Sequence, residues 1–397
     1  MIEGLLQTGK FEFVCFGGAI KHPDYKPIRT EEYGDDWIIY PVDGYGTQEQ
    51  VRALLKAQKP DIVWIMTDPR FWGWLWKIDN EIRSVAPLVY YHVWDNLPYP
   101  TFNRKWYLSN DVVASISKVT DDIVRNVAPE VEIRHMPHAV NDTLFCKIND
   151  RKLVEDFKKD NQLGVDSEGN KRFTFFWNNR NARRKQSGSL MFWFNDFLDR
   201  VGRDKATLIM HTEPKDPNGQ DLDAIRERLG FDDDQFKLST NKLSIQQLSV
   251  LYNSVDCTLN ISDAEGFGLA TLESLATETP IIVNMTGGLQ EQVTDGENWF
   301  GFGIEPCSKA IIGSQEVPWI YEDRISGKDL VDAMVKMYEL SDEERSEMGR
   351  LGRKHVMDNY SMEKYVSGWE NLLESVHQRL GSWDTMTRKQ WSLQKVL

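Results

Sequence analysis

The stretch Val255-Asp-Cys-Thr-Leu-Asn-Ile-Ser-Asp-Ala-Glu-Gly-Phe-Gly-Leu269 decides the fold. Its apolar beginning, residues 255–260, predicts a buried strand, and a helical pattern over 269–277 starts directly after the glycine-containing loop. Gly266 and Gly268 let a ligand approach the backbone closely, because glycine has no Cβ atom. The amino end of the following helix offers unpaired N–H groups and a partial positive charge, so the pattern indicates an anion site.

A second strand, loop and helix follow at once in the sequence. Residues 280–284 form another apolar run, and Thr286 with two glycines precedes another helical segment. We therefore expect a second glycine-lined helix start beside the first. The residues expected to bind the anionic ligand are Gly266, Phe267, Gly268, Leu269, Gly287 and Gly288.

Two glutamates belong to the first loop and its helix. Glu265 stands directly before the glycines, and Glu273 follows within the helix. A carboxylate can accept two hydrogen bonds from a vicinal diol, so one glutamate beside a sugar ring and one beside a ribose is chemically sensible. A single glutamate in a helix is most often a solvated surface charge, but the strand, loop and helix context favours a ligand-binding role here.

A basic window reverses the overall charge of the chain. The 47 basic and 61 acidic residues give a net charge of −14, whereas residues 171–185 contain six basic side chains and no acidic one. Residues 172–177 predict a strand, and the loop that follows holds Arg180 and Lys185. Cations at the end of a strand are placed to neutralise a diphosphate leaving group. The commoner explanation of a basic run alone is a solvated face.

Strand and helix patterns alternate along most of the chain, which predicts an α/β fold of two Rossmann-like lobes facing each other across a cleft. A charged stretch near residue 150 separates two series. The expected parts are a first lobe over 1–145, a second lobe over 146–362, and C-terminal helices over 363–397 that pack back toward the first lobe. The predicted strands are 11–16, 37–40, 61–66, 87–92, 112–116 and 131–136, then 172–177, 206–211, 235–238, 255–260 and 280–284.

The start of the chain has two interpretations. Residues 1–9 resemble the end of a helix that leads into strand 11–16, which predicts a first lobe without its first βα unit. Alternatively, 11–16 is the first strand and Gly17-Gly18 is its loop.

Composition excludes several classes of protein. Hydrophobic residues make up 41% and charged residues 27%, which is typical of a globular protein. The acidic net charge argues against stable binding of nucleic acid. Four scattered cysteines indicate neither a zinc site nor a disulfide framework. No secretory signal or transmembrane segment is visible, so we expect a soluble, cytoplasmic protein.

The quoted motifs carry a resemblance to a known family. The segment 265–273, followed by Pro280 and by Gly287-Gly-x-x-Glu-x-Val-x-Asp-Gly296, resembles the donor-site signature of the retaining glycosyltransferase family 4, whose members have the GT-B fold. Arg180 and Lys185 match an arginine and a lysine, five apart, that hold the donor diphosphate in that family. Residues 135–141 are similar to its hinge segment. The resemblance covers about residues 85–375.

The resemblance implies a retaining transfer of a sugar from a nucleoside-diphosphate sugar to a hydroxyl acceptor. It implies that the lobe over 146–362 binds the donor and that the lobe over 1–145 binds the acceptor. It implies that Glu273 binds the ribose, that Glu265 lies by the donor sugar, and that residues 266–268 present backbone N–H groups. No metal and no prosthetic group is implied. The donor nucleotide stays open among UDP, GDP and ADP, and the acceptor among a glycan, lipid, small molecule, protein or modified DNA base. The alternatives are a nucleotide-sugar epimerase or hydrolase, and an inactive sugar-nucleotide binding protein.

Acceptor-side residues are expected after strand 87–92, in the loop that holds Trp94 and Asp95. His92 or Asp95 is the candidate to orient or deprotonate an acceptor hydroxyl, although a histidine at a strand end is more often structural. His211, at the end of strand 206–211, is a candidate for donor contact. The tryptophans at 72, 74 and 76 are candidates to stack on a sugar, with core packing as the commoner role.

Overall fold

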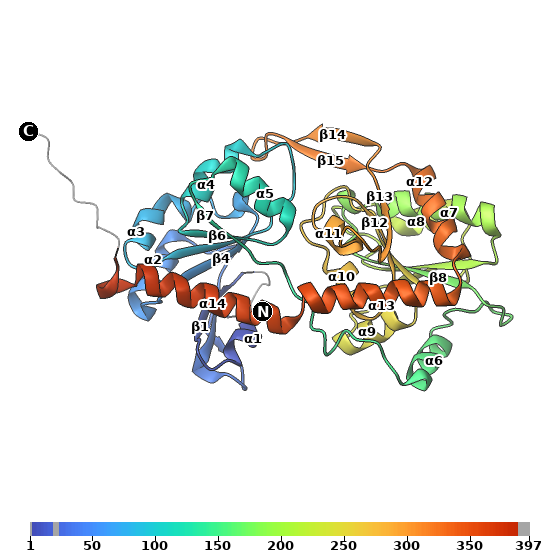
Figure 1. The fold of residues 1–397 in the computed structure, drawn as a ribbon, viewed down its shortest axis with the longest axis horizontal. Coiled ribbons are helices and arrows are strands. Elements are labelled where there is room, and N and C mark those ends of the chain that lie inside the picture. The colour runs from blue at the N-terminus through green and yellow to red at the C-terminus, as the bar shows by residue number, and fades with distance from the viewer. Residues whose placement is uncertain (1, 19–23, 388–397) are drawn as a thin grey trace, which may run out of the picture.

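The computed structural model describes residues 2–18 and 24–387, which form two α/β lobes (Figure 1). The first lobe holds a parallel sheet in the order β4-β5-β6-β7 and a smaller sheet in the order β1-β3-β2. The strands are β1 (Phe13–Gly17), β2 (Ile28–Arg29), β3 (Trp37–Pro41), β4 (Val63–Thr67), β5 (Leu88–His92), β6 (Val112–Ser115) and β7 (Glu132–His135). The helices are α1 (Ile2–Leu6), α2 (Gln48–Gln58), α3 (Asp79–Arg83), α4 (Arg104–Leu108) and α5 (Lys118–Val127).

The two sheets of the first lobe meet where β1 and β4 approach each other. Their side chains touch, since the rings of Phe13 and Trp64 are 6.2 Å apart. Within the described residues, the two strands are not hydrogen-bonded to each other, because β1 pairs with β3 and β4 pairs with β5. The predicted strand 11–16 is therefore β1, and it belongs to a sheet separate from the main sheet of its lobe.

The second lobe is built on a parallel sheet in the order β10-β9-β8-β11-β12-β13. Its strands are β8 (Phe173–Asn178), β9 (Ala206–His211), β10 (Phe236–Ser239), β11 (Cys257–Asn260), β12 (Ile281–Asn284) and β13 (Gly301–Ile304). Its helices are α6 (Arg151–Asp160), α7 (Ser187–Val201), α8 (Leu222–Leu229), α9 (Ile245–Asn253), α10 (Leu269–Ala276), α11 (Leu289–Val293), α12 (Gly327–Glu339) and α13 (Asp342–Asn359). The loops at the carboxyl ends of such strands are the usual ligand-binding edge.

Local sequence signals start several of these helices. Ser244 and Gln247 form a reciprocal capping box at α9, and Ser341 and Glu344 form one at α13. α10 begins differently, because Gly268 precedes it with a positive φ of 96° and no side chain caps its first N–H groups. The backbone N–H groups at the start of α10, directly after the loop with Gly266 and Gly268, therefore have no local side-chain cap.

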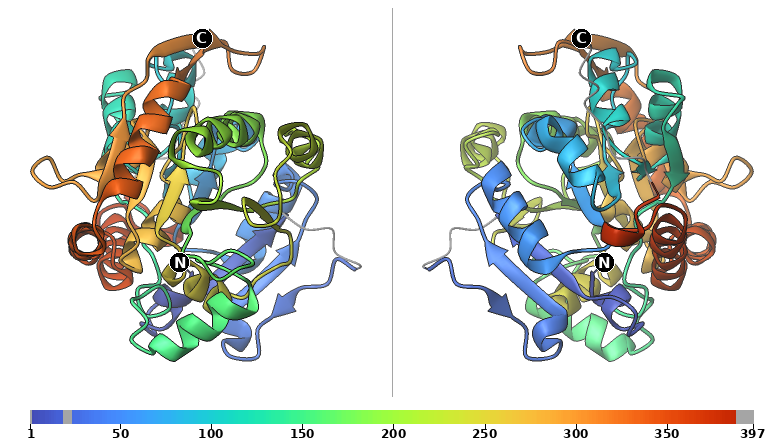
Figure 2. Two further views of the ribbon diagram at one scale, coloured as in Figure 1. Left: turned by 90° about the vertical axis from the view of Figure 1, so that its right-hand side faces the viewer. Right: turned by 90° about the vertical axis from the view of Figure 1, so that its left-hand side faces the viewer.

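α14 (Met362–Leu380) connects the second lobe back to the first. Figures 1 and 2 show α13 and α14 following one another along one side of the molecule, with α14 against the first lobe. Trp369 is fully buried between Trp64 and Tyr91, with ring distances of 4.4 and 4.8 Å. None of the described helices is long and apolar enough to cross a bilayer.

A hairpin of the second lobe also reaches the first lobe. It consists of β14 (Ser308–Ile312) and β15 (Ile320–Arg324), and Figure 1 shows it at the top, extending from the second lobe over the first. The ring of Trp319 packs 4.9 Å from that of Phe102, and the Tyr321 N–H donates to the Leu97 carbonyl. The lobes are thus joined by the hairpin as well as by α14.

Candidate functional site

The two glycine loops of the second lobe lie against each other, as the sequence predicts. The Gly288 N–H donates to the Glu265 carbonyl oxygen at 3.0 Å. A Cβ atom on Gly287 would lie 1.9 Å from that same oxygen, and one on Gly266 would lie 2.9 Å from the Val93 carbonyl oxygen of the first lobe. These glycines therefore permit backbone contacts within the second lobe and between the lobes.

Gly287→Ala is expected to lower the free energy of unfolding by at least about 3 kcal/mol, because it combines two kinds of strain. Gly287 has φ +48°, and its new Cβ would collide with the Glu265 backbone. Gly230→Ala is the matched control, since Gly230 has φ +66° and nothing within 4 Å of its Cβ position. The control should lose only about 1–2 kcal/mol. If both variants lost the same free energy of unfolding in urea, the close contact of Gly287 with Glu265 would contribute nothing to the effect.

Glu265 and Lys185 form a buried ion pair in the second lobe. The Lys185 ammonium donates to Oε2 of Glu265, and their side chains are only 9% and 12% exposed. The Arg184 guanidinium lies 3.9 Å from the same oxygen. Burial raises the pKa of Glu265, but Lys185 and Arg184 outweigh it and keep this pKa below its ordinary value. The carboxylate is therefore ionised, and a concentrated positive charge stands beside it.

Arg180 lies elsewhere on the same loop. Its guanidinium binds Asp216 through two hydrogen bonds of 2.6 and 3.1 Å, and its side chain is 63% exposed. Arg184, which the sequence offered only as part of the basic run, is the arginine that lies beside Glu265 and also donates to the Ala264 carbonyl. No sequence signal distinguished Arg184 from its neighbours.

Asp95 of the first lobe lies close to the charged residues Glu265, Lys185 and Arg184 of the second lobe. Its Cβ atom would be 3.5 Å from a Cβ on Gly287. Burial raises the pKa of Asp95 to about 6, with Arg184 and Lys185 opposing the shift and Glu265 adding to it. The first-lobe carboxylate thus lies next to both the second glycine loop and the basic residues.

His92 and Trp94 lie in the interior of the first lobe. His92 has no exposed surface, and its two ring nitrogens contact the hydroxyls of Tyr90 and Tyr107 at 2.9 and 3.0 Å. Burial lowers the pKa of His92 to about 3. Trp94 is 5% exposed and donates to the Asn96 carbonyl. Asp95 is accordingly the member of this group that reaches the second lobe.

Glu273 is held by side chains from two other elements of its lobe. The Tyr252 hydroxyl donates to Oε2 of Glu273 at 2.9 Å, and the Asn178 amide donates to that hydroxyl at 3.0 Å. Burial raises the pKa of Glu273 to about 7. His211 pairs with Asn178 across β8 and β9, and its Nδ1 contacts the Ser239 hydroxyl at 2.8 Å. Asn178 thus lies between the predicted donor residues Glu273 and His211.

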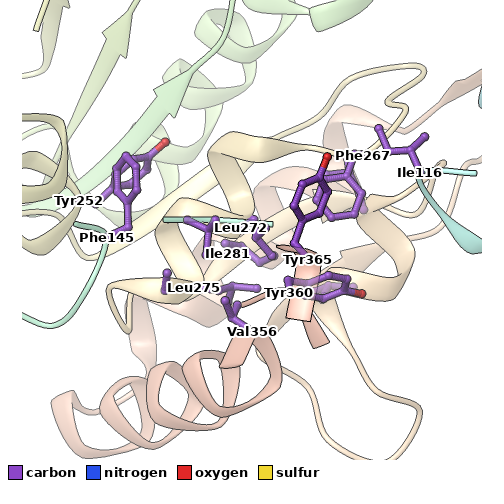
Figure 3. Close-up of a cluster of buried hydrophobic side chains, with 14 of the residues drawn as sticks. Ile116, Phe145, Tyr252, Phe267, Leu272, Leu275, Ile281, Val356, Tyr360 and Tyr365 are labelled. Atoms are coloured by element: carbon purple, nitrogen blue, oxygen red, sulfur yellow. The ribbon is translucent and has the colours of Figure 1, made fainter. Parts of the chain in front are cut away.

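Phe267 anchors the first glycine loop in the core. Its ring packs 5.5 Å from that of His138 and 5.6 Å from that of Tyr360. Figure 3 shows Phe267 and Tyr360 in this cluster of buried side chains. Leu269, by contrast, is 47% exposed at the start of α10. Glu291 of the second loop's helix accepts from the Lys118 N–H of the first lobe at 3.1 Å. Across the described ranges, no group of three or more His, Cys, Asp or Glu side chains is arranged to hold a metal ion.

Comparison with known families identifies the region around these loops. The family model described as "Glycosyl transferases group 1" matches residues 234–355. This region is similar to the group 1 glycosyl transferases. It includes Glu265, Glu273 and both glycine loops, whereas the basic loop with Lys185 lies before it.

Solved structures show the fold of the whole chain. Sucrose-phosphate synthase from Thermosynechococcus elongatus matches with a TM-score of 0.73 and 15% identity, over 95% of this chain and 92% of that chain. A trehalose-phosphate synthase from Burkholderia vietnamiensis matches with a TM-score of 0.67 and 12% identity, over 95% and 94%. The Anabaena HepE protein, solved with UDP and glucose, matches with a TM-score of 0.62 and 14% identity, over 85% and 86%. The predicted GT-B fold is confirmed.

Curated relatives match over a shorter region. Trehalose synthase from Thermococcus litoralis is 25% identical over 150 residues, and trehalose synthase from Pyrococcus furiosus gives the same values. Each match covers 37% of this chain and 31% of the relative, so the aligned part spans about a third of these relatives.

Proposed function

We propose that the protein is a retaining glycosyltransferase that moves a sugar from a nucleoside-diphosphate sugar to a hydroxyl acceptor. The observation that carries the proposal is the buried charge cluster in which Lys185 and Arg184 surround Glu265 next to two touching glycine loops. Such fixed, partly buried cations stabilise negative charge that develops on a leaving diphosphate. The UDP complexes of HepE, which has the same fold, support a nucleotide donor.

In this proposal the second lobe binds the donor. Glu273, positioned by Tyr252, accepts hydrogen bonds from the ribose hydroxyls, and the backbone N–H groups of residues 266–268 face the donor. Lys185 neutralises the departing diphosphate together with Arg180. The Arg180 side chain is 63% exposed, so a phosphate can reach its guanidinium.

Asp95 and Glu265 face the reacting sugar from the two lobes. With a pKa of about 6, Asp95 is ionised at neutral pH and can accept the proton of an acceptor hydroxyl. Glu265, kept ionised by Lys185, lies where positive charge on a sugar ring would be stabilised. The acceptor attacks from the face that the leaving group vacates, which retains the anomeric configuration.

The stereochemistry can be tested without knowing the acceptor, because water can replace it slowly. We expect NMR of the hydrolysis of UDP-α-glucose, GDP-α-mannose or ADP-α-glucose to show the α-anomer of the free sugar first. Early appearance of the β-anomer would contradict a retaining reaction. Conversion of the donor to another nucleotide sugar would identify an epimerase instead.

A further inference from the structure

An exposed group of aromatic rings stands at the carboxyl ends of two first-lobe strands. Tyr45 follows β3, and Phe71 and Trp72 follow β4; we call these three residues the aromatic platform. The rings of Tyr45 and Phe71 are stacked with centroids 4.8 Å apart, and Trp72 meets Tyr45 edge-on at 5.3 Å. Tyr45 and Phe71 are each 38% exposed. Aromatic rings normally bury this area, so an exposed stacked pair indicates a binding surface.

The structure holds the platform rigidly. The Trp72 indole N–H donates to the Met66 carbonyl at 2.7 Å, and the Gln48 amide donates to the Trp74 carbonyl at 2.7 Å. Thr67, the last residue of β4, has a φ of +104°, which is strained for a β-branched residue. Strain of this kind persists where the surrounding structure enforces it, and it gathers at binding sites.

The platform shares an edge of the first lobe with Asp95. Thr67 pairs with His92 across β4 and β5, so the loops that hold Phe71 and Asp95 leave neighbouring parallel strands at the same level. Neighbouring strands are about 4.8 Å apart, so the loop of Phe71 lies one strand away from the loop of Asp95, and Tyr45 stacks on Phe71. A sugar ring stacked on the platform cannot also lie at Asp95, so a ligand that reaches both needs more than one ring.

The charges beside the platform favour a neutral ligand over a polyanionic one. Asp43 and Asp68 flank the rings in sequence, and Asp43 is exposed. Arg70, whose guanidinium lies 5.2 Å from the Phe71 ring centroid, is already paired with Asp68 at 3.1 Å. Carboxylates accept hydrogen bonds from neutral hydroxyl groups, whereas they repel phosphate.

We propose that the aromatic platform binds a distal ring of a neutral oligosaccharide acceptor, whose reacting hydroxyl lies at Asp95. The apolar face of a sugar ring packs on Tyr45 and Phe71, and its hydroxyls meet the neighbouring carboxylates. This inference rests on the proposed glycosyltransferase function and adds the class and minimum length of the acceptor.

Binding of maltotriose, cellotriose and mannotriose, measured by saturation-transfer NMR and titration in the presence of UDP, tests this inference. We expect at least one trisaccharide to bind, and Tyr45→Ala and Phe71→Ala to weaken it about tenfold, which corresponds to 1.4 kcal/mol. Phe71→Trp should restore binding. Phe192→Ala is the matched control, since Phe192 is 46% exposed on α7 of the other lobe.

Three results would overturn the inference. The first is that no trisaccharide binds, and the second is that the alanine variants bind a trisaccharide as tightly as the wild type does. The third is binding of the oligonucleotide dT10 that depends on Tyr45 and Phe71, because the platform would then stack nucleobases. Binding of UDP, GDP and ADP is measured on the wild type and on every variant. Wild-type protein that binds no nucleotide would refute the proposed function, and this outcome is distinct from a failure of the platform.

Discussion

Lys185→Ala is expected to lower kcat about a thousandfold, because it removes the buried cation beside the leaving group. Nucleoside-diphosphate release from the donor measures the effect. Lys171→Ala is the control, since Lys171 belongs to the same basic window but pairs with Asp342 on the surface. A kcat within tenfold of the wild type would contradict the role given to Lys185.

The same substitution leaves Glu265 buried without its partner, which costs about 3–5 kcal/mol of stability. A loss of activity through unfolding must therefore be separated from a loss of catalysis. The double variant Lys185→Met, Glu265→Gln removes both charges and should unfold at a Tm close to that of the wild type. We expect it to be folded and inactive; a folded and active double variant would refute the catalytic assignment.

Glu273→Ala is expected to weaken nucleotide binding about a hundredfold or more, because a carboxylate that accepts two hydrogen bonds contributes about 1.5–3 kcal/mol through each. Isothermal titration with UDP, GDP and ADP measures the loss. Glu297→Ala, in an exposed loop of the same lobe, is the control and should leave affinity unchanged. Equal nucleotide affinity of the wild type and Glu273→Ala would show that Glu273 does not bind the nucleotide.

The raised pKa of Glu273 adds a pH dependence to this prediction. Glu273 keeps its proton up to about pH 7 in the folded protein, whereas it loses the proton near the ordinary pKa of 4.5 in the unfolded chain. Its contribution therefore lowers the free energy of unfolding as the pH rises from 4.5 to about 7. Ribose hydroxyls bind the ionised carboxylate. Nucleotide affinity should therefore increase from pH 6 to pH 8, and Glu273→Gln should abolish that increase.

Most of the fold could be predicted from the sequence, because buried parallel strands appear as apolar runs bounded by turn residues. The strand predicted over 255–260 is β11 (Cys257–Asn260), and the strand predicted over 206–211 is β9 with the same bounds. The hairpin β14–β15 was missed. Its strands lie on the surface, with Ser308 and Lys309 exposed, so they lack the apolar run that marks a buried strand.

The parts of the candidate site that are formed by a local sequence motif could be predicted. Contacts between residues that are distant in the sequence could not. The contact between the two glycine loops followed from consecutive strand, loop and helix units. The pairing of Arg180 with Asp216 and the position of Arg184 beside Glu265 depend on contacts over 36 and 80 residues. The partners of His92 are two tyrosine hydroxyls inside the lobe, which the pattern at the end of the strand does not indicate.

The central claim is that the second lobe binds a nucleoside-diphosphate sugar between its glycine loops and basic residues. Isothermal titration of the wild-type protein with UDP-, GDP- and ADP-sugars tests it most directly. We expect at least one of these donors to bind with a dissociation constant in the micromolar range, and Glu273→Ala to weaken this binding about a hundredfold or more. Absence of binding by every donor in the panel would contradict it.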